Sequence, residues 1–380
     1  MEACIIRDMA LVCNMGDNVH TILNGLAVGE YGEMKLVRMG EKQVPAGIVS
    51  LPLPEIREKE WNTRTNALLK HCLKKLRPIW SDVEPAKLGV VIGSSNAGIE
   101  EYSESWSPDY VDEIALKQLE GGNVARFVAH EVGAQGPCYT INTACSSSAK
   151  ALASAKRLLD SGICDMVIAG GGDGLCHYAL CGFDALQLIS DTRSTALTLN
   201  GGGVNHGEGA ALFVLTRGIP EAGNILIAGY GETADAHHTT TPDPEGIQAV
   251  DAMQKAMRMG RISPQDVGYV NLHGTGTDAN DTMEINAMLT VFGDKQPPCS
   301  STKPYTGHTL GAAGAIEAAL CVAMLQRAQC QLPLQPWLNG LTDLPPLNLS
   351  AQTEKPLRHI ISNSFAFGGN NIALLVSRHA

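Results

Sequence analysis

The chain has 380 residues, of which 44% are hydrophobic and 18% charged, and this balance excludes an intrinsically disordered protein. Its formal net charge of -11 at pH 7 argues against broad, nonspecific nucleic-acid binding, although a local basic patch could still receive an acidic partner. The length suits either two or three average domains or one large α/β unit with an extensive core.

The N-terminal stretch MEACIIRDMALVCNMG contains an apolar run that Arg7 and Asp8 interrupt. No stretch of the chain approaches the ~18 to 20 uninterrupted apolar residues of a membrane-spanning helix. Eleven cysteines lie in apolar surroundings without any CxxC pair, which is typical of reduced core residues and not of a structural zinc site. We therefore expect a cytoplasmic protein with no membrane span and no metal.

Short apolar, β-branched runs that end in glycine or polar residues predict buried strands. They cover residues 87–95, 138–144, 165–171, 210–217, 267–274 and 371–378. Apolar residues at three- and four-residue spacing predict helices. These cover residues 63–76, 146–160 and 311–329. The alternation indicates an α/β protein, in which the Pro-rich segment 332–348 is expected to be an ordered surface excursion.

A weak internal repeat predicts that the chain is a duplicated α/β unit. AALFVLTR near the midpoint and NIALLVSR at the C-terminus have the same length, end alike and follow Gly-rich loops. The helix expected after Cys145 also has a small-residue counterpart after His308. We expect halves at residues 1–217 and 218–380; chance similarity of two buried strands is the alternative.

The stretch INTACSSSAKAL places Cys145 between a predicted strand and a helix that begins with three serines. Unpaired N–H groups and the positive end of the helix dipole favour a thiolate at such a helix N-terminus. A lowered pKa would make Cys145 a nucleophile. The alternative is one more small buried residue, as we expect for the other ten cysteines.

Two loop histidines strengthen the case for a catalytic site. His273 ends a predicted strand before a Gly-rich turn, and His308 follows Lys303 by five residues. The helix after His308 is so rich in Gly and Ala that another backbone or a ligand must approach it closely. A single loop histidine is more often structural. One cysteine with two histidines at strand ends, where α/β proteins place their sites, favours catalysis.

Four motifs together carry a family resemblance: TACSSS around Cys145, HGTGT from His273, the KxxxxH spacing from Lys303 to His308 followed by GAAGAIE, and the terminal NSFAFGGNN. In this order and spacing they resemble the β-ketoacyl-acyl-carrier-protein synthase family, from about residue 9 to the C-terminus. The elongating branch, with a Cys-His-His triad, is the better match, because the Cys-His-Asn branch would need Asn at position 308. The resemblance implies a thiolase-like, five-layer αβαβα fold of two pseudo-duplicated halves.

The resemblance also implies a decarboxylative condensation. Cys145 would take an acyl group from the phosphopantetheine arm of an acyl carrier protein, so the carrier brings the cofactor and the synthase binds none. A malonyl thioester would then lose carbon dioxide. Its enolate oxygen would accept hydrogen bonds from His273 and His308 as neutral imidazoles, and the N–H groups of Cys145 and Phe367 would hold the oxyanion of the acyl thioester.

Further residues take roles that the resemblance implies. Lys303 would organise the site electrostatically with Glu317 as its acidic partner, and a structural ion pair is the alternative. Phe367, followed by two glycines, resembles a gate over the acyl pocket. The expected substrate contacts are Thr275 and Thr277 for the pantetheine arm, Phe365, and, in the loop ADAHHTTTPDPEG, Asp235 and His238 as gating residues or members of a solvated turn.

The same resemblance implies two binding partners, an acyl carrier protein and a second ketosynthase-like subunit. The carrier is acidic and the chain itself is net negative, so a local cationic patch must steer their approach. The candidates for this patch are Arg64, Lys70, Lys74, Lys75 and Arg193, with a solvated helix face as the alternative. We also expect the family's dimer, formed either with a second copy or with a homologous ketosynthase.

Where elongating synthases usually have a Phe-Asp and then an Arg-Asp-Gly before the GEGA turn, this chain reads ALTLNGGGVNHGEGA, with three consecutive glycines at 201–203. The departure favours a specialised synthase, for polyketide or aryl polyene assembly, over a housekeeping fatty-acid enzyme. Two alternatives are a non-catalytic chain-length factor and a same-fold acyltransferase or hydrolase. The presence of the cysteine and both histidines argues against the chain-length factor.

Overall fold

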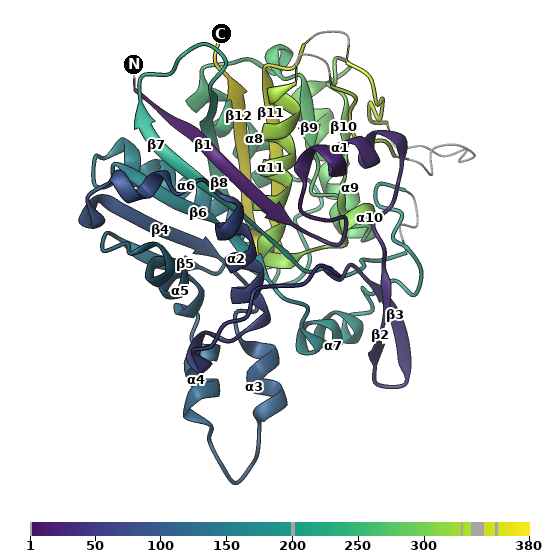
Figure 1. The fold of residues 1–380 in the computed structure, drawn as a ribbon. Coiled ribbons are helices and arrows are strands. Elements are labelled where there is room, and N and C mark those ends of the chain that lie inside the picture. The colour runs from purple at the N-terminus through teal and green to yellow at the C-terminus, as the bar shows by residue number, and fades with distance from the viewer. Residues whose placement is uncertain (1, 199–201, 328–329, 336–345, 354–355) are drawn as a thin grey trace.

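The computed structural model describes residues 2–198, 202–327, 330–335, 346–353 and 356–380 (Figure 1). Ten of the described strands form one sheet. They are β1 (Ala3–Val12), β4 (Leu88–Gly93), β5 (Cys138–Ile141), β6 (Met166–Asp173), β7 (Gly209–Gly218), β8 (Ile225–Ala234), β9 (Tyr269–Asn271), β10 (Cys299–Ser300), β11 (His359–Ala366) and β12 (Asn370–Arg378). A separate hairpin consists of β2 (Lys35–Met39) and β3 (Lys42–Ala46).

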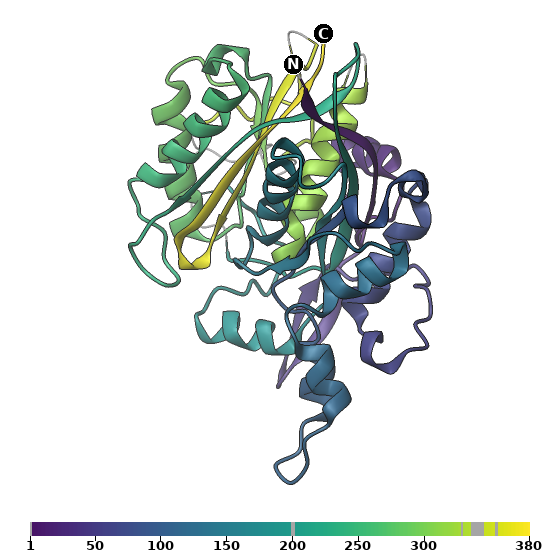
Figure 2. The same cartoon turned by 90° about the vertical axis from the view of Figure 1, so that its left-hand side faces the viewer.

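Helices cover the sheet and pass through the middle of the molecule (Figures 1 and 2). They are α1 (Val19–Val28), α2 (Arg64–Lys75), α3 (Ile99–Ser105), α4 (Glu113–Leu119), α5 (Asn123–Val132), α6 (Ser147–Asp160), α7 (His177–Ala185), α8 (Ile247–Gly260), α9 (Asp278–Phe292), α10 (Lys303–Thr306) and α11 (Ala313–Gln326). Within the described ranges, no helix is long and apolar enough to cross a membrane.

The strand order is symmetric about the β1–β8 pair. From β1 the sheet continues as β7, β6, β4 and β5, and from β8 it continues as β12, β11, β9 and β10. Both series begin with two antiparallel pairings and end with two parallel ones. The strands of the internal sequence repeat, β7 and β12, therefore occupy equivalent places. The α/β class is confirmed, and the division of the chain at residues 217 and 218 stays a prediction.

The core of the molecule lies around α6 and α11, which run between the two series of strands (Figure 2). Helix α6 packs on β4 and β6, α11 packs on β11 and β7, and the two helices contact each other. A Cβ atom on Gly314 of α11 would lie 2.7 Å from the Cβ of Ala149 in α6. This contact confirms the close approach predicted from the Gly and Ala content of the helix after His308.

Outer helices complete the layers. On the β4–β7 side, α2 packs on β6 and β7 while α5 packs on β4 and β5; on the other side, α8 packs on β8 and β12 and contacts α9. The described elements thus form five layers: outer helices, strands, the central helices, strands and outer helices. This order places the ends of strands from both halves next to the N-termini of the two central helices.

All six predicted strands are present as β4, β5, β6, β7, β9 and β12, and the three predicted helices are α2, α6 and α11. The other elements were not predicted. Strand β1 was not predicted because the charged pair Arg7 and Asp8 interrupts its run of apolar residues. In the structure, the pairing of β1 with β7 shifts in register between Ile6 and Asp8 and so accommodates the pair. Residues 328–329 of the predicted helix and 336–345 of the predicted Pro-rich excursion lie outside the described residues.

Candidate active site

Cys145 is presented by a sharp turn between β5 and α6. Ala144, directly before it, has a φ of 51°, a conformation that costs a non-glycine residue energy and occurs mainly where the surroundings enforce it. Ser147 at the start of α6 holds the turn closed, because its hydroxyl donates to the Ala144 carbonyl at 2.6 Å and accepts the Thr143 N–H at 2.9 Å. The predicted junction of strand, cysteine and helix is therefore present.

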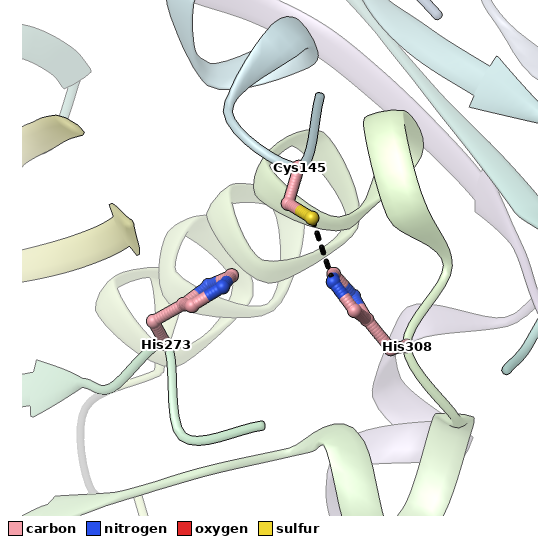
Figure 3. A group of neighbouring side chains, drawn as sticks. All are labelled: Cys145, His273 and His308. Atoms are coloured by element: carbon pink, nitrogen blue, oxygen red, sulfur yellow. Dashed lines mark hydrogen bonds between the residues drawn. The ribbon is translucent and has the colours of Figure 1, made fainter. Parts of the chain in front are cut away.

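The two predicted histidines meet at this cysteine (Figure 3). His308 Nε2 lies 2.9 Å from Cys145 Sγ. The rings of His273 and His308 lie 5.5 Å apart at 84° to each other, and both are buried with Cys145. His273 follows β9, and His308 follows α10, so the tertiary fold brings together three residues that are far apart in sequence. This convergence is the central feature of the site.

The predicted lowering of the Cys145 pKa is wrong for this structure. Burial raises the pKa of the thiol to about 12, although Lys303 and the main-chain N–H groups of Cys145 and Phe367 act in the opposite direction. Desolvation of a thiolate outweighs these favourable interactions because the side chain is only 5% exposed. Cys145 is therefore a neutral thiol that needs a nearby proton acceptor, and His308 Nε2 is within reach.

Both imidazoles are neutral at physiological pH. Burial lowers the pKa of His273 and of His308 well below the usual value, and the positive charge of Lys303 lowers both further. Lys303 Nζ lies 2.5 Å from Glu317 Oε1, and the two side chains are almost fully buried. Burial raises the pKa of Glu317, whereas Lys303 acts to lower it. The predicted ion pair is thus present beside the histidines.

Two buried carboxylates that the sequence analysis missed fasten the histidine loops. Glu284 of α9 accepts the N–H groups of His273 and Gly274, both at 2.8 Å. Asp173, the last residue of β6, accepts the Gly311 N–H at 2.7 Å, three residues after His308, and also binds the Ser94–Asn96 turn after β4. An acidic residue at the end of a strand as apolar as β6 was the signal that could have identified Asp173.

A cavity of about 380 Å³ opens over Cys145. Eight of the predicted catalytic and substrate-binding residues line it: Cys145, His238, His273, Thr275, Thr277, His308, Phe365 and Phe367. Lys303, Glu317 and Asp235 do not line it. The hydroxyls of Thr275 and Thr277 lie 3.0 Å apart on the same wall, and the ring of Phe365 lies 6.4 Å from that of His273.

The loop after Phe367 contacts the predicted facing loop. Gly368 donates its N–H to the Thr239 carbonyl at 2.7 Å, and Asp235 donates its N–H to the Gly369 carbonyl at 2.9 Å. The Asp235 carboxylate also accepts from Asn371 Nδ2 at 2.6 Å. His238 is exposed and accepts the N–H of Thr240 through Nδ1. Asp235 therefore holds the Phe367 loop, whereas His238 stabilises its own turn.

Two of the predicted docking cations are held by contacts within the chain. Arg64 donates from Nε to the buried Glu208 carboxylate at 3.1 Å and from its terminal nitrogen to the Val49 carbonyl at 3.0 Å. Arg193 is half-buried and donates to the carbonyls of Pro304 at 2.8 Å and Gly32 at 3.1 Å. Both guanidinium groups stabilise the fold, so they are weaker docking candidates than their charge suggested.

The three predicted docking lysines of α2 differ in whether an ion pair within the chain engages them. Lys70 pairs with Glu131 at 3.1 Å and Lys75 pairs with Asp17 at 2.6 Å. Lys74 is exposed and has no ion-pair partner in the part of the chain that the structure describes. Among the described residues, Lys74 is the one of the five predicted cations for which neither an ion pair nor a hydrogen bond of its ammonium group is seen, whereas Arg193 lacks an ion pair but is half-buried.

The sulfur and the imidazoles of the site could also hold a metal ion. One ligand atom each from Cys145, His273 and His308 lies within 4.8 Å of the other two, and sulfur with nitrogen is a donor set that zinc accepts. The same closeness is required of a nucleophile that works with two hydrogen-bonding groups. The expectation of no metal stays a prediction.

Comparisons with known proteins agree on one family. The model of the Beta-ketoacyl synthase N-terminal domain matches residues 69–219, and that of the Beta-ketoacyl synthase C-terminal domain matches residues 225–334. A relative from Rhizobium meliloti, named 3-oxoacyl-acyl-carrier-protein synthase 2, is 32% identical over 79% of this chain and 76% of its own length. A relative of the same name from Staphylococcus aureus is 28% identical over 98% of this chain and all of its own length.

Solved structures give the same picture. A chain from a ketosynthase in complex with its chain length factor, from Xenorhabdus doucetiae, is 36% identical with a TM-score of 0.91 over 100% of this chain and 98% of that one. A beta-ketoacyl synthase from Burkholderia phymatum is 26% identical with a TM-score of 0.85 over both full lengths.

Proposed function

Because the chain belongs to the β-ketoacyl synthase family and is a condensing acyltransferase, we propose that Cys145, His273 and His308 carry out its decarboxylative condensation. The likeness to solved ketosynthases also confirms the thiolase-like fold that the sequence predicted. The observation that supports the assignment of these three residues is their convergence, with His308 Nε2 at 2.9 Å from Cys145 Sγ.

The first half-reaction transfers the acyl group to Cys145. The thiol attacks the carbonyl of an acyl thioester on the carrier, and its proton passes to His308 Nε2. The pantetheine thiolate leaves and takes up this proton, so that His308 is neutral again. The N–H groups of Cys145 and Phe367, which both act to lower the pKa of the thiol, are proposed to stabilise the oxyanion at the same centre.

The second half-reaction forms the carbon–carbon bond. A malonyl thioester on the carrier loses carbon dioxide, and the electrons of the broken bond form an enolate whose oxygen accepts hydrogen bonds from His273 and His308. The enolate carbon attacks the acyl-Cys145 carbonyl, and the sulfur leaves as a thiolate that takes up one proton from solvent to restore the thiol. Decarboxylation itself generates the nucleophile, so neither neutral imidazole has to act as a strong base in this step.

Lys303 supports both half-reactions through its charge. Burial lowers the pKa of His273 and His308 and the charge of Lys303 lowers both further, so the imidazoles stay neutral in a site where negative charge develops. Glu317 compensates the buried ammonium at 2.5 Å. Thr275 and Thr277, on the wall of the cavity, are proposed to bind the pantetheine arm, and Phe365 and Phe367 to contact the acyl chain.

The substrates are proposed to arrive on an acyl carrier protein, which supplies the phosphopantetheine. We further propose that the chain pairs with a homologous ketosynthase-like subunit in a specialised pathway, as in polyketide or aryl polyene assembly. The likeness to the ketosynthase complex from Xenorhabdus doucetiae supports this pairing. The alternative that this chain is itself a chain-length factor is not favoured, because the cysteine and both histidines are present and converge.

The test uses acyl-loaded and malonyl-loaded carrier with the purified protein. Cys145→Ala should abolish both the acyl-enzyme and the condensation product, whereas Cys164→Ser, in the apolar core, should retain both. His273→Ala and His308→Ala should each lower malonyl decarboxylation by about 10² to 10³, the usual effect of losing one oxyanion donor. Mass spectrometry of the protein and of the carrier measures each product.

Three outcomes would reject the proposal or one of its parts. An acyl adduct on another cysteine would remove Cys145 as the nucleophile. An acyl-enzyme that releases free acid without carbon dioxide would indicate the acyltransferase or hydrolase alternative. Normal decarboxylation by either histidine variant would make that histidine structural.

A further inference from the structure

The main chain of His308 is held by a segment that begins at Asn205. The His308 N–H donates to the Asn205 carbonyl at 2.7 Å, and the His308 carbonyl accepts the Gly207 N–H at 2.9 Å. A Cβ atom on Gly307 would lie 2.6 Å from the His206 carbonyl oxygen, so the two segments are in direct backbone contact. A shift of the Asn205 segment would therefore shift the main chain of His308 with it.

The ring of His308 depends on this main chain for its position. Its Nδ1 is buried and has no hydrogen-bond partner among the residues that the structure describes. Its Nε2 faces Cys145 Sγ at 2.9 Å (Figure 3). Because no carboxylate or carbonyl group of the described residues orients the ring through Nδ1, a displacement of the main chain would carry Nε2 away from the sulfur.

The side chain of Asn205 is buried, and both of its polar atoms are bonded. It is 2% exposed. Its Oδ1 accepts the Ser194 N–H at 2.7 Å, and its Nδ2 donates to the carbonyls of Thr192 at 2.8 Å and Ser190 at 3.3 Å. All three partners are main-chain groups of one loop. Asn205 thus fastens the segment that holds His308 to this loop. The sequence analysis did not single out Asn205.

The same loop, residues 190–194, also holds α10, which precedes His308. Arg193 donates to the carbonyl of Pro304 in α10 at 2.8 Å. The loop therefore binds the chain before His308 through Arg193, and it binds the main chain of His308 through Asn205. If the side-chain contacts of Asn205 were lost, Arg193 would still hold α10, so His308 could move while the surrounding fold stays in place.

We propose that Asn205 is a positioning residue, which keeps His308 Nε2 within reach of the Cys145 thiol by fixing the main chain of His308. The inference rests on the proposed roles of Cys145 and His308. Asn205 does not line the cavity, so it acts through His308 and not on the substrate. A displacement of Nε2 on the order of 1 Å should slow acyl transfer roughly 10- to 100-fold, because proton transfer requires a short, aligned contact.

The test measures acyl transfer from acyl-carrier to Cys145 by mass spectrometry of the intact protein. Asn205→Ala should lower the rate constant at saturating carrier roughly 10- to 100-fold. The carrier concentration that gives the half-maximal rate should stay within about twofold of the wild-type value, because the cavity that binds the substrate is unchanged. Asn205→Ser, whose short side chain cannot make the three contacts, is a second variant if the alanine variant does not fold.

A double-mutant cycle separates positioning of His308 from general support of the fold. In a protein that already carries His308→Ala, the additional change Asn205→Ala should alter the rate constant by less than about twofold, because the group that Asn205 positions is absent. A residue that only supports the fold would lower the rate constant by the same factor with and without the imidazole.

Asn123→Ala is the matched control. Asn123 is 1% exposed, and its Nδ2 donates to the carbonyls of Glu60 and Lys117, both at 2.9 Å. Its Oδ1 accepts from Asn66 Nδ2 at 2.8 Å. This buried amide therefore makes the same set of contacts as Asn205, but it lies outside the cavity and does not contact the His308 segment. The rate constant of Asn123→Ala should equal that of the wild type.

Three results would overturn the proposal: an unchanged rate constant in the Asn205 variants, an equal loss in Asn123→Ala, or an equal loss from Asn205→Ala in the His308→Ala protein. A wild-type protein that is not acylated on Cys145 would instead refute the proposed function, so the two failures are distinguishable.

Discussion

At the scale of single residues, burial decides the state of the Cys145 thiol. A helix N-terminus lowers the pKa of a cysteine that water still reaches, but here the surrounding protein removes the water that would solvate a thiolate. The pKa of about 12 means that proton transfer must accompany attack. His308 Nε2, at 2.9 Å and uncharged because of its lowered pKa, is the proposed acceptor for that proton.

The alkylation of Cys145 by iodoacetamide tests this description. The thiolate is the reactive form, so its rate should rise about tenfold per pH unit from about pH 6 to about pH 9 and should not reach a plateau. Peptide mass spectrometry follows Cys145 and, as an exposed reference in the same chain, Cys181. A plateau of the Cys145 rate below about pH 8 would indicate a stable thiolate–imidazolium pair and contradict the assignment.

At the scale of elements, buried carboxyl groups connect the segments that contain His273 and His308 to the neighbouring helices and strands. Glu284 ties the His273 loop to α9, and Asp173 ties the segment after His308 to the ends of β4 and β6. Burial raises the pKa of Glu284 to about 7, even though the two N–H groups and Asn363 favour its charged form. A carboxylate in this position makes the site sensitive to pH.

The stability of the folded protein should therefore depend on the titration of Glu284. In the unfolded chain this group ionises near pH 4.5, whereas in the folded protein it holds its proton until about pH 7. The free energy of unfolding of the wild type, minus that of Glu284→Gln, should fall as pH rises from about 4.5 to about 7, by at most roughly 1.4 kcal/mol per pH unit. It should be constant above that range.

Urea unfolding of both proteins at constant ionic strength measures this difference. Asp281, whose pKa burial raises to about 6, is common to both proteins and largely cancels. A difference that is independent of pH, or that grows with pH, would show that Glu284 is already ionised in the folded state.

At the scale of the whole molecule, the distribution of charge decides how an acidic carrier reaches the cavity. The chain carries a formal charge of -11, so any attraction must come from a local patch. Ion pairs within the chain engage Arg64, Lys70 and Lys75, and Arg193 donates to two carbonyls. Lys74 has no such contact in the part of the chain that the structure describes. Charge reversal at Arg64 would break a contact with the buried Glu208, so it cannot separate docking from folding.

Lys74→Glu is the cleaner variant for testing carrier docking. The apparent KM for carrier-bound acyl substrate should rise, and more strongly at low salt, because exposed charges act mainly on the rate of encounter. Activity on small acyl thioesters without the carrier should stay close to that of the wild type. Lys35→Glu makes the same change on the exposed side of β2 and is the control. Equal losses with both kinds of substrate, or an equal effect of Lys35→Glu, would contradict docking at Lys74.

The sequence by itself determined the α/β class and the six predicted strands, and it predicted the three residues that the fold brings together, Cys145, His273 and His308. The strands and the class depend on local information, namely apolar runs that end in glycine and helical spacing, whereas the roles of the three residues were predicted from the motifs of the family resemblance. The internal repeat also indicated that β7 and β12 hold equivalent places, as the symmetric strand order bears out.

Only the tertiary structure decided the protonation state of the Cys145 thiol and the positions of Asp173 and Glu284 behind the histidine segments. It also decided that Phe183 stacks on Phe367 and that Arg64 binds Glu208. Each of these depends on how much water reaches a group and on which distant residue lies beside it. Neither quantity is set by the neighbours of a residue in sequence, because desolvation and pairing arise when β-strand ends, α6 and α11 pack together. For that reason the residues that meet in the candidate site could be predicted from the sequence, and their protonation and partners could not.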